Sequence, residues 1–238
     1  MTLATHTLGC KLNFAETSHL QRQLQSVGFD IVSHHEVADV YVINTCTVTA
    51  GATKKCRNAI RQAVALNPDA VVAVIGCFAQ TDADQIARIP GVDIILGNDR
   101  KHLLPEILKI ENGKLKVERT YPPASRYPSQ EGTLPHPDNS QFSILNSQFP
   151  FHPAYSGGDR THTCFKIQDG CDYFCTYCAI PFARGRSRSA SIADTVAMAR
   201  EIAATGTREV VLTGVNTGTF GQAVGESFLD LLRQLDDI

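Results

Sequence analysis

The sequence predicts an α/β protein that starts with a parallel sheet and continues into the first βα units of an incomplete (β/α) barrel. Three observations support this class. Apolar runs of strand length alternate with helical patterns over residues 1–118. The runs at 40–43 and 71–75 are almost continuously apolar, as is typical of strands buried on both faces. After a proline-rich interval the strand–helix alternation resumes and repeats twice before Ile238.

The first part, residues 1–118, contains four predicted strands, at 3–8, 37–45, 70–75 and 92–96. Helices are expected between and after them. Leu20, Leu24 and Val27 have the spacing of one apolar helix face, and Gly28 would end that helix. Further helices are expected over 50–66, ending before Pro68, over a short stretch near 80, and over 101–110.

Residues 119–160 interrupt the alternation, and most of the prolines of the chain fall there. Such a composition does not build a packed core, so the segment is predicted to be a linker. The tetrapeptide Asn-Ser-Gln-Phe occurs in it twice, at 139–142 and 146–149, and suggests no function.

The last part, residues 161–238, contains two predicted strands, at 163–167 and 210–213. Ser191 and Asp194 have the spacing of a capping box, which begins a helix that Gly206 ends. A last helix is expected to present Phe228, Leu232 and Leu235 on one face. A barrel needs several more such units, so we expect the chain to be a fragment or a truncated product.

Composition narrows the class of protein. The net charge of −2 argues neither for nor against a nucleic-acid partner. No apolar stretch is long enough to span a bilayer, and the N-terminus lacks the pattern of a signal peptide. Eight cysteines in such a chain are better explained as metal-cluster ligands than as disulfides. We therefore expect a cytoplasmic protein without a membrane partner.

Three cysteines, Cys171, Cys175 and Cys178, follow the strand predicted at 163–167 with CxxxCxxC spacing. A four-iron cluster takes one thiolate per iron, so three thiolates leave one iron open for a small molecule. Zinc sites favour paired CxxC motifs, and no second pair is present. The alternative is three ordinary buried cysteines.

Cys10, Cys46 and Cys77 each come directly after a predicted strand. The carboxyl ends of parallel strands share one edge of a sheet, where ligands bind. The three thiolates could therefore meet and hold a second cluster. The alternative is three unrelated structural cysteines, since free cysteine is often simply buried.

Four motifs in order carry a resemblance to a known family. They are Gly9-Cys-Lys-Leu-Asn13, Asn44-Thr-Cys-Thr-Val-Thr49, Gly76-Cys77 and the loop from Cys171 to Cys178. Together they resemble the radical S-adenosylmethionine (SAM) methylthiotransferases. The first two motifs are most similar to the branch acting on N6-threonylcarbamoyladenosine in tRNA. Other branches act on isopentenyladenosine in tRNA or on an aspartate of a ribosomal protein.

The resemblance implies two [4Fe-4S] clusters, one on Cys171, Cys175 and Cys178 and an auxiliary one on the N-terminal three cysteines. It implies that the first cluster reduces bound SAM and so activates C2 of the adenosine at tRNA position 37. The auxiliary cluster would present the sulfur that is methylated and transferred. A reductase or flavodoxin-type protein would donate the electron. Members of this family continue into the rest of the barrel and an RNA-binding β-barrel, and we expect both parts to be missing from a fragment such as this.

Other residues have two explanations each. Gly214 and Asn216 could contact SAM or form a plain turn. Arg184, Arg186 and Arg188 could bind tRNA phosphate or the SAM carboxylate, or lie on a solvated loop. We expect Cys56 and Cys164 not to be ligands. The competing hypotheses for the whole chain are a tRNA methylthiotransferase and a non-catalytic iron–sulfur module.

Overall fold

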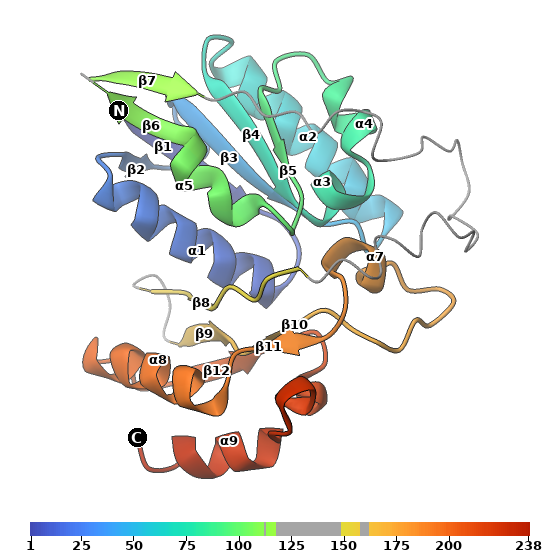
Figure 1. Ribbon diagram of the computed structural model, residues 1–238. Helices are drawn as coiled ribbons and strands as arrows, with labels where there is room; N and C mark the ends of the chain where they lie inside the picture. Colours follow the sequence, from blue (N-terminus) through green and yellow to red (C-terminus); the bar gives the residue numbers. More distant parts are fainter. Residues whose placement is uncertain (112, 118–148, 158–161) are drawn as a thin grey trace.

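The computed structural model describes residues 1–111, 113–117, 149–157 and 162–238. Its first part is a five-stranded sheet in the order β2-β1-β3-β4-β5 (Figure 1). All neighbouring strands of this sheet are parallel, which confirms the predicted class. The strands are β1 (Thr2–Thr7), β2 (Asp30–Val32), β3 (Val40–Thr45), β4 (Val71–Gly76) and β5 (Ile94–Leu96).

Helices cover both faces of this sheet (Figure 1). One face packs α1 (Lys11–Ser26) and α5 (Leu104–Ile107), which follows the short 3-10 helix η1 (Lys101–Leu103). The other packs α2 (Ala50–Leu66), α3 (Cys77–Thr81) and α4 (Ala83–Ala87). β3 and β4 are covered on both sides, and this explains why their sequences are apolar throughout rather than alternating.

Helix α2 occupies the range predicted for it. Thr49 caps its start, since its side-chain oxygen accepts a 3.0 Å hydrogen bond from the backbone N–H of Ala52. Asn67 lies outside the helix, and the following Pro68 disfavours helical geometry there.

The second part contains a three-stranded sheet in the order β12-β9-β8. β12 (Val210–Thr213) lies parallel to β9 (Thr163–Lys166), as two βα units require. Helices α8 (Ile192–Ala204) and α9 (Phe228–Leu235) pack on it with the 3-10 helices η3 (Thr217–Thr219) and η4 (Gln222–Val224) nearby. The predicted cap of α8 is confirmed, because the Ser191 hydroxyl accepts from the backbone N–H of Asp194 at 3.1 Å.

Several sequence predictions need correction. The helix expected over 101–110 ends at Ile107, and the chain turns there into a hairpin of β6 (Leu108–Glu111) and β7 (Lys114–Val117). Val27 is exposed, because α1 has already ended. Leu232 is also exposed, and its neighbour Leu231 is the fully buried residue of α9.

The linker predicted over 119–160 lies outside the described residues except for 149–157. In that stretch β8 (Ala154–Tyr155) pairs antiparallel with β9, a strand that the sequence did not suggest. Helix α1 packs against both β8 and β9 and so joins the two parts of the molecule (Figure 1). Arg22 on α1 donates a 2.6 Å hydrogen bond to the carbonyl of Tyr155. None of the helices in the described part of the chain has the length and apolar character needed to cross a bilayer.

Candidate functional site

The three N-terminal cysteines predicted as ligands follow adjacent strands at one edge of the sheet. Thr7 of β1 pairs with Asn44 of β3, and Thr45 pairs with Gly76 of β4, so the strands end level with one another. Cys46 and Cys77 come directly after the ends of β3 and β4, and Cys10 lies three residues after the end of β1. The strand order changes direction between β1 and β3, and ligands of such sheets bind at this point.

Two glycines allow the cysteine-bearing loops to approach closely. Gly9 has φ +105°, and a Cβ placed on it would lie 3.1 Å from the Sγ of Cys46. Gly76 has φ +96°, and a Cβ there would lie 2.8 Å from the carbonyl oxygen of Thr45. Both positions demand a residue without a side chain. The glycine before Cys10 and the glycine before Cys77 therefore set the spacing around Cys46.

Asn13 holds two of these loops together from inside the protein. Its fully buried amide donates to the carbonyl of Leu8 at 2.8 Å and to that of Thr45 at 3.0 Å. Asn44 in turn donates from its amide to the carbonyl of Asn13 at 3.1 Å. The asparagines of the two N-terminal motifs are thus scaffold residues beneath Cys10 and Cys46.

The sulfurs of Cys77 and Cys10 lie close enough to Cys46 to affect the pKa of its thiol. Burial raises the pKa of the Cys46 thiol most strongly, and repulsion by Cys77 and Cys10 adds to the increase. A thiol whose ionisation is opposed in this way is stabilised as a thiolate when a cationic group binds beside it. The chemistry of this donor set therefore fits an iron–sulfur cluster.

Cys56 lies beneath Cys46 in a supporting role. It is fully buried on α2, and its Sγ accepts from the backbone N–H of Cys46 at 3.3 Å and donates to its carbonyl at 3.4 Å. Burial raises the pKa of the Cys56 thiol to about 11, which keeps it protonated. Cys164 is buried against Ala15 and Ala154.

Cys171, Cys175 and Cys178 lie on a loop that a short ladder closes. β10 (Gln168–Asp169) pairs antiparallel with β11 (Arg188–Ser189), and the backbone N–H of Cys171 donates to the carbonyl of Gly185 at 3.1 Å. Cys175 is exposed, and Cys171 and Cys178 are half-buried. The loop thus lies at the surface, and Cys175 is the most exposed of its three cysteines.

The aromatic residues of the loop have unequal environments. Phe174 has φ +45°, a strained conformation for a side chain of this kind, and the Arg186 guanidinium lies 5.3 Å from its ring centre. Tyr173 and Tyr177 are exposed by 70% and 85%. Their rings are free to cover a group bound at the cysteines.

Gln168 connects the loop to the turn that follows β12. Its side-chain oxygen accepts from the backbone N–H of Asn216 at 2.8 Å, and its amide donates to the carbonyls of Asp169 and Gly170. A Cβ on Gly214 would lie 2.9 Å from the Gln168 side-chain oxygen. The predicted SAM contacts Gly214 and Asn216 therefore lie beside the base of the cysteine loop, with the Asn216 N–H already engaged.

Between the two cysteine sites lies a network of buried ion pairs, which we call the buried ion-pair network. The carboxylates are Glu16 and Asp169, and the cations are Lys101, Lys166, Arg184 and Arg188. Arg184 is 1% exposed and lies 2.9 Å from Asp169 and 3.3 Å from Glu16. This corrects one expectation, because Arg184 is not on a solvated loop. Arg186 is half-exposed and lies 3.6 Å from Asp172.

Helix α7 (Ile180–Arg184) brings this network to the edge of the parallel sheet, where it packs against α3 (Figure 1). Asn98 secures the contact. Its amide nitrogen donates to the carbonyl of Ala183 at 2.7 Å and lies 3.4 Å from the Sγ of Cys77. Its side-chain oxygen accepts from Lys101 at 2.6 Å.

No group of three or more His, Cys, Asp and Glu side chains in the described part of the chain is arranged to hold a single metal ion. A cluster distributes its thiolates over separate irons, so its ligands need not converge on one point.

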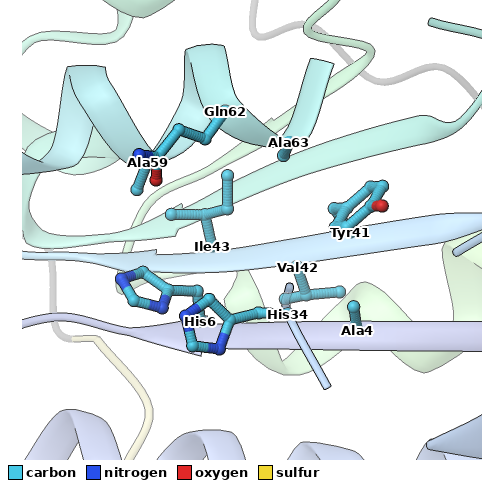
Figure 2. Close-up of a pocket in the computed structure, with 9 residues that line it drawn as sticks. All are labelled: Ala4, His6, His34, Tyr41, Val42, Ile43, Ala59, Gln62 and Ala63. Atoms are coloured by element: carbon cyan, nitrogen blue, oxygen red, sulfur yellow. The ribbon is translucent and has the colours of Figure 1, made fainter. Parts of the chain in front are cut away.

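Two hollows lie away from the cysteines. A small cavity of about 20 Å³ is lined by His6 and His34 together with residues of β3 and α2 (Figure 2). The ring centres of the two histidines are 4.2 Å apart. A wider hollow of about 530 Å³ lies between β9 and the start of α8. The described lining of neither hollow contains a cysteine.

Sequence reasoning missed the residues that connect the two sites, namely Asn13, Glu16, Asn98, Lys101, Lys166 and Gln168. A polar residue on an otherwise apolar helix face, such as Glu16 on α1, was the available signal. Its five-percent exposure places it among core residues.

This chain is similar to known proteins over both of its parts. Residues 2–97 match the family described as "Uncharacterized protein family UPF0004", and residues 165–233 match the Radical SAM superfamily. A Bacillus subtilis (strain 168) protein named threonylcarbamoyladenosine tRNA methylthiotransferase MtaB is 39% identical over 240 residues, which cover 99% of this chain and 48% of the relative.

An Aquifex aeolicus (strain VF5) protein of the same name is 35% identical over 99% of this chain and 53% of the relative. A Trichlorobacter lovleyi protein named tRNA-2-methylthio-N(6)-dimethylallyladenosine synthase is 30% identical over 95% of this chain and 49% of the relative. The chain thus spans about half the length of the curated relatives it matches.

Proposed function

We propose that this chain, which belongs to the radical SAM methylthiotransferase family, carries the two iron–sulfur centres of an enzyme that adds a methylthio group to tRNA. The observation that supports this best is the placement of α7. It joins the loop of Cys171, Cys175 and Cys178 to the sheet edge where Cys10, Cys46 and Cys77 lie. Two sets of three thiols are thereby brought to one region of the molecule.

In this proposal Cys171, Cys175 and Cys178 hold a [4Fe-4S] cluster that leaves an iron for SAM, and Cys10, Cys46 and Cys77 hold the auxiliary cluster. When bound, the clusters and SAM would supply the radical chemistry and the sulfur. The chain's own residues position these groups. Asn13 and Asn98 hold the auxiliary loops, and Gln168 holds the turn with Gly214 and Asn216 against the radical SAM loop.

The exposed Tyr173 and Tyr177 cover the substrate side of the radical SAM cluster in this proposal. A reactive carbon radical requires water and stray hydrogen donors to be excluded. Two rings exposed by 70% and 85% have the freedom to close over a bound adenosine. The electron comes from a reductase or a flavodoxin-type protein.

For the substrate we propose N6-threonylcarbamoyladenosine at position 37 of tRNA. Relatives named for threonylcarbamoyladenosine are 32–39% identical to this chain, and relatives named for dimethylallyladenosine are 30–32% identical. The test is nucleoside mass spectrometry of tRNA from a strain that lacks its own methylthiotransferases and expresses this chain. Methylthiolated dimethylallyladenosine instead would overturn the substrate assignment.

Iron counting after anaerobic reconstitution tests the two centres. We expect about eight irons per chain, and about four when either set of three cysteines is replaced by alanine. Cys164→Ala is the matched control and should retain about eight. A count of about four that does not change on replacing Cys171, Cys175 and Cys178 would contradict the second centre. Full iron loading without any methylthiolated nucleoside would leave a non-catalytic iron–sulfur module.

A further inference from the structure

The buried ion-pair network carries more positive than negative charge. Among the described residues four cations, Lys101, Lys166, Arg184 and Arg188, face two carboxylates, Glu16 and Asp169. The exposed fractions of these side chains are 8% or less, except for 14% at Arg188. Buried charge in excess is costly unless an anion compensates it. Two positive charges of this network therefore require a counter-charge.

The electrostatic environment of Arg184 indicates where that counter-charge lies. Burial by itself lowers the pKa of Arg184, but Glu16 and Asp169 raise it well above its ordinary value, and Cys77 and Cys10 add smaller contributions of the same sign. The N-terminal thiols therefore act on this guanidinium across the contact between α3 and α7.

Arg184 also positions the ligand loops mechanically. It donates a 2.5 Å hydrogen bond to the side-chain oxygen of Asn13, which holds the loops of Cys10 and Cys46. The carbonyl of Ala183 accepts from Asn98, whose amide nitrogen lies 3.4 Å from the Sγ of Cys77. Two consecutive residues of α7 thus form hydrogen bonds with Asn13 and Asn98. These two asparagines contact Cys77 or the loops that carry Cys10 and Cys46.

We propose that Arg184 is a positioning residue which the radical SAM part contributes to the Cys10–Cys46–Cys77 centre, and that the excess positive charge of the buried ion-pair network is the counter-charge of the anionic cluster bound there. This inference rests on the proposed function, because it requires that cluster. It goes beyond that function in one respect: residues 162–238 supply positive charge that stabilises the cluster held by the N-terminal cysteines.

If this is so, the reduction potential of the auxiliary cluster depends on the net charge of the buried ion-pair network. Reduction adds one negative charge to the cluster, and nearby positive charge stabilises that form. Arg184→Gln removes a positive charge and should shift the midpoint potential to more negative values. Glu16→Gln removes a negative charge and should shift it to more positive values. The double variant restores the net charge and should lie between the two.

The experiment uses the whole chain with Cys171, Cys175 and Cys178 replaced by alanine, so that only the auxiliary cluster binds. The potential is measured by electron paramagnetic resonance during an anaerobic dithionite titration. Arg184→Lys keeps the charge and should stay near the parent potential. Arg233→Gln is the charge control, because that exposed arginine on α9 pairs with Asp230, outside the network.

Opposite shifts for Arg184→Gln and Glu16→Gln support the inference, since general disruption of the fold would move both potentials in the same direction. Shifts of one sign, or no shift in either variant, overturn it and leave the proposed function standing. If Arg184→Gln does not fold, the sign of the potential shift in Glu16→Gln still decides: a shift to more positive values supports the inference, and any other result overturns it. A parent that binds no iron instead removes the proposed function, and the inference with it.

Discussion

The guanidinium of Arg184 donates a 2.5 Å hydrogen bond to the side-chain oxygen of Asn13, 171 positions earlier in the chain. Asn13 lies three residues after Cys10, and Arg184 six residues after Cys178. This one contact links the loops of the two predicted cysteine centres. Both side chains are buried, so the link is protected from water.

The first prediction concerns Asn13→Ala. The substitution removes hydrogen bonds to two buried carbonyls and to Arg184. Polar groups that lose their hydrogen-bond partner inside a protein destabilise the folded state. We therefore expect the free energy of unfolding to fall by about 2–4 kcal/mol. Urea denaturation of the iron-free chain measures this. Asn58→Ala, at an exposed position of α2, should change it by less than about 0.5 kcal/mol. Equal effects would mean that Asn13 has no special role.

The second prediction concerns acid stability. Burial alone would raise the pKa of Glu16, but attraction by Arg184, Lys101 and Lys166 outweighs burial and holds this pKa well below its ordinary value. A lowered carboxyl pKa stabilises the fold above the unfolded-state value and loses that stabilisation as the pH falls.

We therefore expect stability to decrease below about pH 4.5 and Glu16→Gln to flatten this decrease. Thermal melts between pH 3 and pH 7, roughly the range in which carboxyl groups titrate, measure the slope. Glu209→Gln, at an exposed position, should leave the slope unchanged. An unchanged slope in Glu16→Gln would show that this carboxylate does not control acid unfolding.

The third prediction concerns Gly9→Ala. The new Cβ would meet the Cβ of Cys46 at 2.9 Å in a backbone of φ +105°, so one of the two loops must move. We expect iron after reconstitution to fall to about four per chain through loss of the N-terminal centre. Gly206→Ala is the control, because its φ is +84° and nothing lies within 4 Å of the added atom. It should cost about 1–2 kcal/mol of stability while retaining its iron. If both variants lost iron to the same extent, backbone strain alone would explain the loss and the contact with Cys46 would not be its cause.

The fourth prediction concerns thiol reactivity in the iron-free chain. Cys56 is fully buried with a pKa of about 11, whereas Cys175 is exposed. Iodoacetamide reacts with accessible thiolates, so Cys175 should be alkylated within minutes at pH 8 and Cys56 should remain unmodified. Peptide mapping by mass spectrometry identifies the order. Early labelling of Cys56 would mean that α2 opens readily around it.

Much of the fold could be predicted from local pattern. Helix α2 was predicted with its observed bounds, and the proline that follows it marks its end in the sequence. β2, β8 and the ladder of β10 with β11 were not predicted. Each has two or three residues and exists only through pairing with a partner elsewhere in the chain. A two-residue strand has no periodicity to read.

The sequence by itself determined the six candidate ligand cysteines and the parallel sheet, because cysteine spacing and apolar runs are local properties of the chain. The tertiary structure alone decided that Arg184 is buried, and that Glu16, Lys101 and Lys166 join it between the two sites. The ionic state and the partners of a charged side chain depend on its burial and on residues up to 171 positions away. No local pattern encodes those distances, since they arise only when α1, β9 and α7 pack together.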